Sequence, residues 1–70
     1  MSERALELVI ALEDELLAQY DKLEAVIGRP SYAIFSVDER RQIERKHAEI
    51  SGLMTQANTM KYQLSKLISN

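Results

Sequence analysis

The stretch IGRPSYAIFSVDE, residues 27–39, divides the 70-residue chain into two long amphipathic segments. Gly28 can adopt the left-handed conformation that ends many helices, and Pro30 prevents a helix from continuing through it. Ser36 and Glu39 match the S-x-x-E pattern of a capping box, in which each side chain accepts a hydrogen bond from the other residue's backbone N–H. The stretch therefore predicts the end of one helix, a short elbow and the start of a second helix.

The elbow, expected over residues 28–35, contains the bulky residues Tyr32, Ile34 and Phe35. Bulky side chains in such a connector usually close the end of a helical pair, and the alternative is that they contact a ligand. A connector this short makes the two helices antiparallel. The fold class that we predict is all-α: an antiparallel two-helix hairpin, coiled-coil-like, in a single domain spanning residues 1–70.

The first helix, expected from about residue 3 to residue 27, has apolar residues spaced three or four apart. This spacing places them on one stripe of a helix. The stripe contains Val9, Leu12, Leu16, Tyr20, Leu23 and Ile27. It is widened by Leu6, Leu8, Ile10, Leu17 and Val26. One partner helix covers only a narrow seam, so this surplus predicts that the hairpin assembles into a helical homo-oligomer.

The second helix is expected from about residue 36 to residue 68. At 100° per residue, nine apolar residues fall on one arc that we expect to be core. They are Ile43, Ile50, Leu53, Met54, Ala57, Met60, Leu64, Leu67 and Ile68. Lys61 falls near the middle of this arc, and we expect it to extend its ammonium to solvent or to pair with Glu3 or Glu7. His47, on the edge, is expected to be a satisfied core residue. The alternative is that both line a pocket for anionic groups.

No charged residue occurs from Ile50 to Met60, which is unusual for a helix surface in water. Beside the apolar arc, mostly small polar residues recur with coiled-coil spacing. They are Ser51, Thr55, Asn58, Tyr62 and Ser65. Small side chains permit close approach, and their polar groups can bond one another or a ligand. We expect this stripe to face another copy of the chain.

Composition limits the other ways of stabilising so small a chain. About 70 residues supply a core worth only a few kcal/mol without a further constraint. The chain has no cysteine and one histidine, which argues against disulfides and a structural zinc site. Self-association is the remaining source of stability. The broken apolar run at the N-terminus predicts neither a signal peptide nor a membrane span, and we expect a cytoplasmic protein.

Charge is unevenly distributed along the chain. The net charge is −2, but residues 1–27 contain seven acids and two bases, and residues 28–70 contain four acids and seven bases. Two helices of opposite sign lying side by side would explain this, and a basic site for an anionic partner is the alternative. The low isoelectric point disfavours nonspecific binding to nucleic acid.

The densest charge is ERRQIERKH, residues 39–47, in which Arg41 and Arg45 lie on one outer face. We expect them to pair with Asp21 and Glu24. The alternative is a phosphate site, since guanidinium groups bind phosphate oxygens in pairs. A ligand that touches both this cluster and Asn58 would need two chains, because the two regions lie roughly 25 Å apart along one helix.

The sequence contains no nucleotide-binding glycine loop, no nucleophile elbow and no set of metal ligands. Glu13, Asp14 and Glu15 are consecutive, so they point to different sides of a helix and form no carboxylate pair. His47 and Ser51 lie four residues apart, but they have neither an orienting acid nor oxyanion donors. We therefore expect a protein that is not an enzyme and that uses no cofactor.

Residues 15–50 resemble the small helical-hairpin proteins common in tailed-phage genomes, often labelled as related to a crAss-like phage protein. The shared pattern is an acidic helix, a Gly/Ser-Pro elbow with a buried aromatic residue, and a capped second helix. It is carried here by Lys22, Leu23, Val26, Ile27, Gly28, Pro30, Tyr32, Ser36 and Glu39. The sequence departs from the family pattern at Lys46, Ile50 and Leu53.

The resemblance implies a phage accessory protein in a bacterial cytoplasm. Some small helical phage proteins are counter-defence sponges, which trap nucleotide-derived immune signals (cyclic dinucleotides or cyclic ADP-ribose compounds) between subunits. Candidate ligand-binding residues are Arg29, Tyr32, Arg41, Arg45, Asn58, Lys61 and Tyr62. Two alternatives remain open: an interaction module that binds a host or phage protein, and a structural hairpin of the phage particle.

Overall fold

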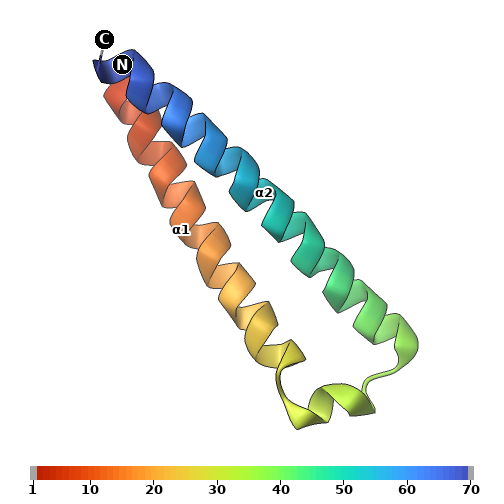
Figure 1. The fold of residues 1–70 in the computed structure, drawn as a ribbon. Coiled ribbons are helices and arrows are strands. Elements are labelled where there is room, and N and C mark those ends of the chain that lie inside the picture. Colours follow the sequence, from red (N-terminus) through yellow and green to blue (C-terminus); the bar gives the residue numbers. More distant parts are fainter. Residues whose placement is uncertain (1, 70) are drawn as a thin grey trace.

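A computed structural model describes residues 2–69 and contains two long helices joined by a short one. Helix α1 spans Ser2–Ile27, the 3-10 helix η1 spans Pro30–Ile34, and helix α2 spans Val37–Ser69. The chain runs along α1, turns at η1 and returns along α2, so the two termini lie at the same end (Figure 1). The prediction of an all-α hairpin with two packed helices is confirmed.

The end of α1 differs from its expected geometry. Neither Gly28 nor Gly52 has a positive φ, so the prediction of a left-handed Gly28 is wrong. The N–H of Gly28 instead donates to the carbonyl of Glu24 at 2.9 Å, as in a continuing helix. Arg29 is extended (φ −79°, ψ 143°), which is the conformation that a following proline imposes. Pro30 therefore ends the helix through the residue before it.

The elbow is closed by two of its three bulky residues. The rings of Tyr32 and Phe35 lie 5.7 Å apart, and both are half-buried. The Tyr32 hydroxyl donates to Glu44 Oε1 at 3.2 Å, which ties the elbow to α2. Ile34 is 84% exposed, so the prediction that it also closes the helical pair is wrong. In a tight 3-10 turn, successive side chains point in different directions, and only some of them reach the helices.

The predicted capping box begins α2. The backbone N–H of Ser36 donates to Glu39 Oε1 at 3.0 Å, and the backbone N–H of Glu39 donates to Ser36 Oγ at 3.1 Å. The first of these bonds is the main reason that the pKa of Glu39 is lowered. The box thus satisfies backbone donors that the first turn of a helix otherwise leaves unpaired.

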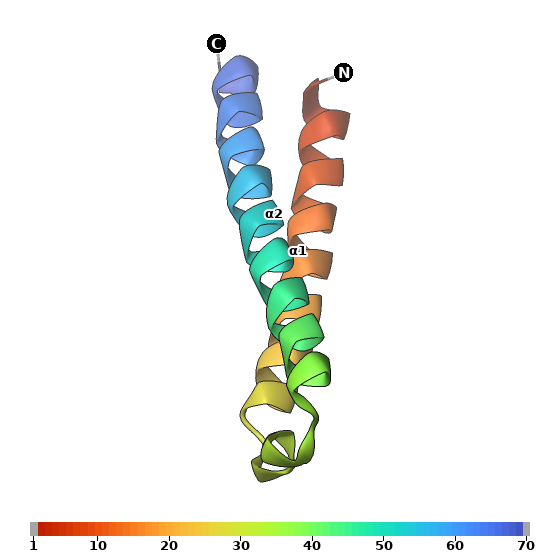
Figure 2. The same cartoon turned by 90° about the vertical axis from the view of Figure 1, so that its right-hand side faces the viewer.

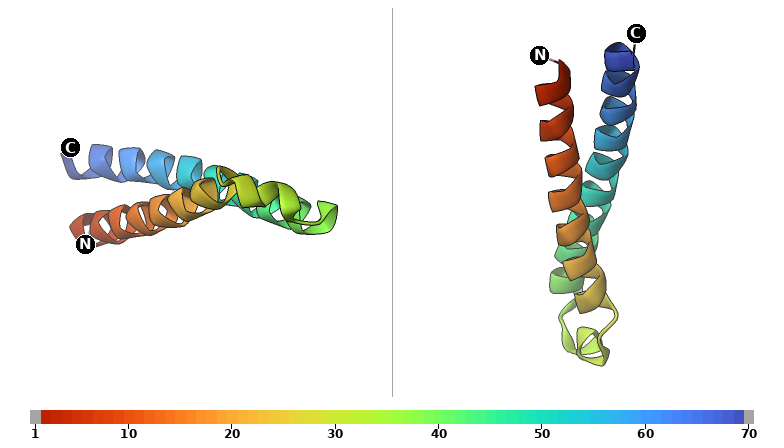
Figure 3. Two further views of the ribbon diagram at one scale, coloured as in Figure 1. Left: turned by 90° about the horizontal axis from the view of Figure 1, so that it is seen from below. Right: turned by 90° about the vertical axis from the view of Figure 1, so that its left-hand side faces the viewer.

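Helices α1 and α2 pack along a narrow seam, which we define as the buried and half-buried residues spaced alternately three and four apart. On α1 the seam is Leu6, Val9, Glu13, Leu16, Tyr20, Leu23 and Ile27. On α2 it is Ile43, His47, Ile50, Met54, Ala57, Lys61 and Leu64. This is the spacing of a coiled coil. The helices stand apart at the elbow in Figure 1 and at the open end in Figures 2 and 3, so the pair twists along its length.

The seam is narrower than the sequence predicts. Leu12 is 50% exposed, and Glu13 occupies the seam in its place. Leu53, Met60 and Leu67, expected in the core of α2, are 48%, 49% and 66% exposed. The expected arc was too wide because a single partner helix contacts only the residues nearest to its axis.

The hairpin is a rod with little interior. It measures 53 × 14 × 14 Å, and its Cα radius of gyration is 15.9 Å, whereas a compact chain of this length has roughly 11 Å. Within residues 3–69, the hydrophobic residues that are buried are Val9, Ile50 and Ala57, which are 3–8% exposed. A core of this size leaves many large apolar side chains of both helices about half exposed.

Candidate functional site

The two broad sides of the rod differ in chemistry. We call one side the apolar face and define it by Leu8, Leu12, Leu53, Met60 and Leu67. We call the hollow on the other side the groove and define it by Leu6, Ile10, Leu17, Asn58 and Tyr62. The seam separates them, because the residues on its two flanks belong to different hollows of the surface.

The apolar face is a strip of large side chains toward the open end of the hairpin. Leu12, Leu53 and Met60 line one hollow of about 110 Å³ together with Leu16, Gln56 and Ala57. Leu8 is one turn from Leu12, and Leu67 is two turns from Met60, so they extend the strip on each helix. The five defining side chains are between 48% and 66% exposed. A row of half-exposed Leu and Met side chains is the surface that a further helix pair would cover.

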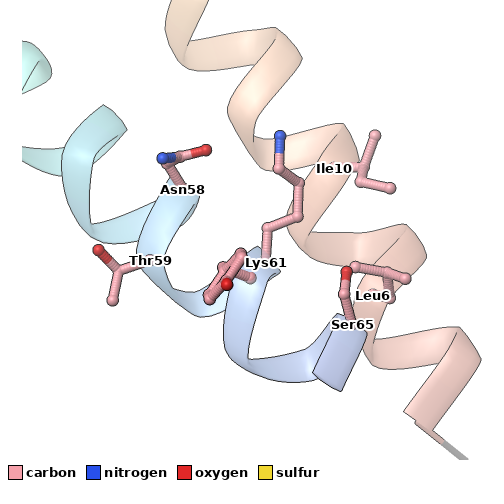
Figure 4. A pocket seen from close by; sticks show the side chains of 7 residues that line it. Leu6, Ile10, Asn58, Thr59, Lys61 and Ser65 are labelled. Carbon is pink, nitrogen blue, oxygen red and sulfur yellow. The ribbon is translucent and has the colours of Figure 1, made fainter. Parts of the chain in front are cut away.

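The groove consists of two adjoining hollows that share Asn58. The first, of about 380 Å³, is lined by Leu6, Ile10, Asn58, Thr59, Lys61, Tyr62 and Ser65 (Figure 4). The second, of about 370 Å³, is lined by Glu13, Asp14, Leu17, Met54, Thr55 and Asn58. Both are open to solvent, and both lie in the half of the hairpin nearer its open end. The predicted polar stripe of α2 therefore forms one wall of this groove, and α1 forms the other.

A charged pair crosses the seam beside the groove. Lys61 Nζ lies 2.7 Å from Glu13 Oε1, and the two side chains are 34% and 24% exposed. Figure 4 shows the Lys61 side chain extending from α2 toward α1. The expected partners, Glu3 and Glu7, were wrong, because the antiparallel register brings Glu13 opposite Lys61. The single-chain groove therefore holds a cation that is already neutralised.

A second polar cluster crosses the seam nearer the elbow. His47 Nε2 lies 2.7 Å from Glu24 Oε1, and the imidazole packs 4.5 Å from the ring of Tyr20. Hydrogen bonding by His47, and then by Tyr20, lowers the pKa of Glu24. The same carboxylate raises the pKa of Tyr20, because it accepts a hydrogen bond from the protonated phenol. Glu24 thus pairs with His47 and not with Arg41 or Arg45, which were its expected partners. His47 is a satisfied seam residue.

The seven candidate ligand-binding residues do not form one site. Asn58, Lys61 and Tyr62 line the same hollow. Tyr32 is part of the elbow, where its hydroxyl is bonded to Glu44. The remaining three are arginines that are exposed and form no ion pair with any residue that the structure describes: Arg29, Arg41 and Arg45. The expected pairing of Arg41 and Arg45 with Asp21 and Glu24 is therefore absent between residues 3 and 69.

Residues that the sequence reasoning missed dominate the groove. Ile10 and Leu17 are 40% and 46% exposed and give it an apolar wall. Lys66 Nζ lies 4.7 Å from the centre of the Tyr62 ring, which is a cation–π contact. The spacing of Glu13 from Val9 and Leu16 was the signal for its place in the seam, because four and three residues are the two steps of a coiled coil.

Two threonine hydroxyls of the α2 wall are satisfied within the helix. Thr55 Oγ1 donates to the Ser51 carbonyl at 3.2 Å, and Thr59 Oγ1 donates to the Thr55 carbonyl at 3.1 Å. Covering this wall would strand neither hydroxyl proton. The neutral stretch from Ile50 to Met60 is therefore less polar in practice than its composition indicates.

Comparison with protein-family models finds no match, and comparisons with curated proteins and with solved structures find none either. The resemblance to tailed-phage hairpins stays a prediction. Over the part of the chain that the structure describes, no three His, Cys, Asp or Glu residues come together in a way that could hold a metal ion. Neither α1 nor α2 is long and apolar enough to cross a membrane.

Replacing one member of the Glu13–Lys61 pair is expected to destabilise the hairpin, because the other charge is left half-buried. Lys61→Leu or Glu13→Leu should each lower the free energy of unfolding by roughly 1–3 kcal/mol, below the cost at a fully buried pair. The double variant should recover most of that loss, since two leucines complete an apolar seam. Urea unfolding at one fixed protein concentration measures all four proteins. Losses that simply add in the double variant would show that the two charges are not coupled.

The Glu24–His47 contact predicts an acid-dependent loss of stability. Because the folded state lowers the pKa of Glu24 below 4.5, the contact stabilises the protein above that pH. Its contribution is lost as the pH falls through the folded pKa. The stability advantage of the native chain over Glu24→Gln should therefore shrink between about pH 6 and pH 3. Glu49→Gln, an exposed change without a partner on α1, is the control. An advantage that is equal at both pH values would contradict the role of Glu24.

Proposed function

We propose that this chain is a non-enzymatic interaction module whose working unit is a bundle of two copies joined through the apolar face. The observation that carries the proposal is the strip formed by Leu8, Leu12, Leu53, Met60 and Leu67, which is about half exposed, whereas the described part of the chain buries only three hydrophobic residues. A monomer would have to maintain this strip in water with almost no interior to offset it.

A second copy fits this face better than an unrelated partner. The strip lies on both helices of a straight rod, so two hairpins related by a twofold axis can place their strips face to face. The result is a four-helix bundle in which each helix contacts two neighbours. That arrangement converts the narrow seam of one hairpin into a continuous core.

The proposal predicts that Leu12 and Leu17, though alike in type, helix and exposure, respond oppositely to substitution. They are 50% and 46% exposed, but Leu12 belongs to the apolar face and Leu17 to the groove. Leu12→Lys should reduce the native mass to that of one chain, because each copy would then bury a lysine ammonium group in the proposed interface. Leu17→Lys should leave the dimer mass unchanged. Light scattering at matched concentrations measures both.

A different result would contradict the proposed interface. If Leu17→Lys dissociates the protein and Leu12→Lys does not, the copies join through the groove. If the native chain already has the mass of a monomer at micromolar concentration, the self-association proposal fails. Circular dichroism of each variant separates dissociation from loss of the helices.

A second proposal, which the resemblance to phage hairpins supports, is that a tailed-phage protein of this kind sequesters a nucleotide immune signal in the bacterial cytoplasm. Its structural support is the exposed Arg41 and Arg45, which have no acidic partner among the described residues. A guanidinium pair of this kind can bind phosphate oxygens. The groove cannot supply that site alone, since its Lys61 is paired with Glu13. The site would have to combine residues of two copies.

Calorimetry with cyclic dinucleotides and with cyclic ADP-ribose isomers tests this second proposal. Binding should be measurable with the native chain and should be lost in the double variant Arg41→Glu, Arg45→Glu, because both phosphate contacts reverse their sign. Glu49→Gln serves as the matched surface control. The absence of binding heat for every one of these ligands would rule out sequestration of this class of signal.

A further inference from the structure

We infer that the groove binds a basic amphipathic helix of another protein. The inference rests on the proposed function in one respect: the groove stays open only if the copies join through the opposite, apolar face. The occupant is defined by three properties of the groove: its apolar strip, the acids of its α1 wall and the absence of charge over residues 50–60 of its α2 wall.

The apolar strip of the groove runs along α1. Ile10 and Leu17 are seven residues apart, so their side chains lie on one line two turns apart, and Leu6 adds a third apolar contact. Tyr62, 63% exposed, closes the strip from the α2 side. A helix that lies in a groove can contact apolar side chains at this spacing with the residues at its own i, i+3 and i+7 positions.

The α1 wall is acidic. Asp14 lines the groove, and Glu7 and Asp21 lie seven residues to either side of it on the same line of the helix. Of the cations nearby, Lys61 is bound by Glu13. Arg4, in a weak exposed pair with Glu7 at 3.8 Å, and Lys66, over the uncharged Tyr62 ring, keep their charges, but the three acids of this line outnumber them. A ligand with cations along one edge would therefore be attracted, whereas a phosphate would be repelled.

The α2 wall opposite is neutral, so the two edges of a bound helix face different surroundings. Residues 50–60 have no charge, and the hydroxyls of Thr55 and Thr59 are bonded within their own helix. A partner can cover Thr55 and Thr59 without stranding their hydroxyl protons. The side-chain amide of Asn58, shared by the two hollows, can bond the partner. A helix with one basic edge and one small or apolar edge complements the two walls at once.

The length of the groove fixes the size of the probe. From Leu6 to Leu17 the rise along α1 is roughly 17 Å, which is the length of about eleven helical residues. A peptide of about two heptads with a leucine face and lysines on one edge therefore matches it. The control is the same peptide with glutamates in place of the lysines. Isothermal titration of both into the native full-length chain is the measurement.

The lysine peptide should bind with a micromolar Kd, and the glutamate peptide should bind at least about tenfold more weakly. Raising the salt from about 50 mM to about 500 mM should weaken the lysine peptide, because the acids of α1 are exposed. Equal binding of the two peptides, or no binding of the lysine peptide at about 100 µM, would overturn the inference.

The paired leucine variants locate the binding surface. Leu17→Lys should weaken the lysine peptide at least about tenfold while the chain keeps its native mass. Leu12→Lys should change the mass and leave binding of the peptide within about twofold. If Leu12→Lys weakens the peptide and Leu17→Lys does not, the peptide occupies the apolar face, and the inference fails even if self-association is correct. If Leu12→Lys leaves the mass unchanged while Leu17→Lys abolishes peptide binding, the groove is correct and the proposed dimer fails.

Discussion

The narrow seam between α1 and α2 is the constraint on which the rest of the structure depends. A pair of helices buries only the residues that face each other, and here the described core holds three buried hydrophobic residues. Most other apolar side chains of the two helices are half-buried in the seam or exposed on its flanks. The shape of the molecule, its two unlike faces and the case for assembly all follow from this geometry.

Two polar contacts across that seam define how the helices meet. Glu13 with Lys61 and Glu24 with His47 each join α1 to α2 at 2.7 Å. Polar residues in a coiled-coil seam fix register at a cost in stability, because any sliding of one helix leaves a charge half-buried and unpaired. The register in turn places Leu12 beside Met60 on one side and Asp14 beside Asn58 on the other.

The hairpin could be predicted from the sequence because its signals are local. Pro30 and the Ser36–Glu39 box act over three or four residues and need no knowledge of the partner helix. The partners of Lys61 and Glu24 could not be predicted, because they depend on the register between two helices, which no local pattern specifies. The exposure of Leu12 and Leu53 could not be predicted either. Their spacing is that of core residues, but a single partner helix is too narrow to cover them. Of the candidate site, the sequence indicated Asn58, Lys61 and Tyr62, but it missed Ile10 and Leu17, which supply the apolar wall.

On the proposed function, the unlike faces would give a small chain two separable tasks. The apolar face, mostly Leu and Met with Gln56 beside them, would suit a permanent interface, whereas the groove combines an apolar strip with acids and would suit a reversible, charge-steered one. The central claim is that the apolar face joins two hairpins side by side. Small-angle X-ray scattering of the native protein tests it most directly, since it gives mass and length together. The account predicts twice the 8.0 kDa chain mass with a longest dimension far short of twice 53 Å. A mass of 8.0 kDa, or a doubled mass with a doubled length, would contradict it.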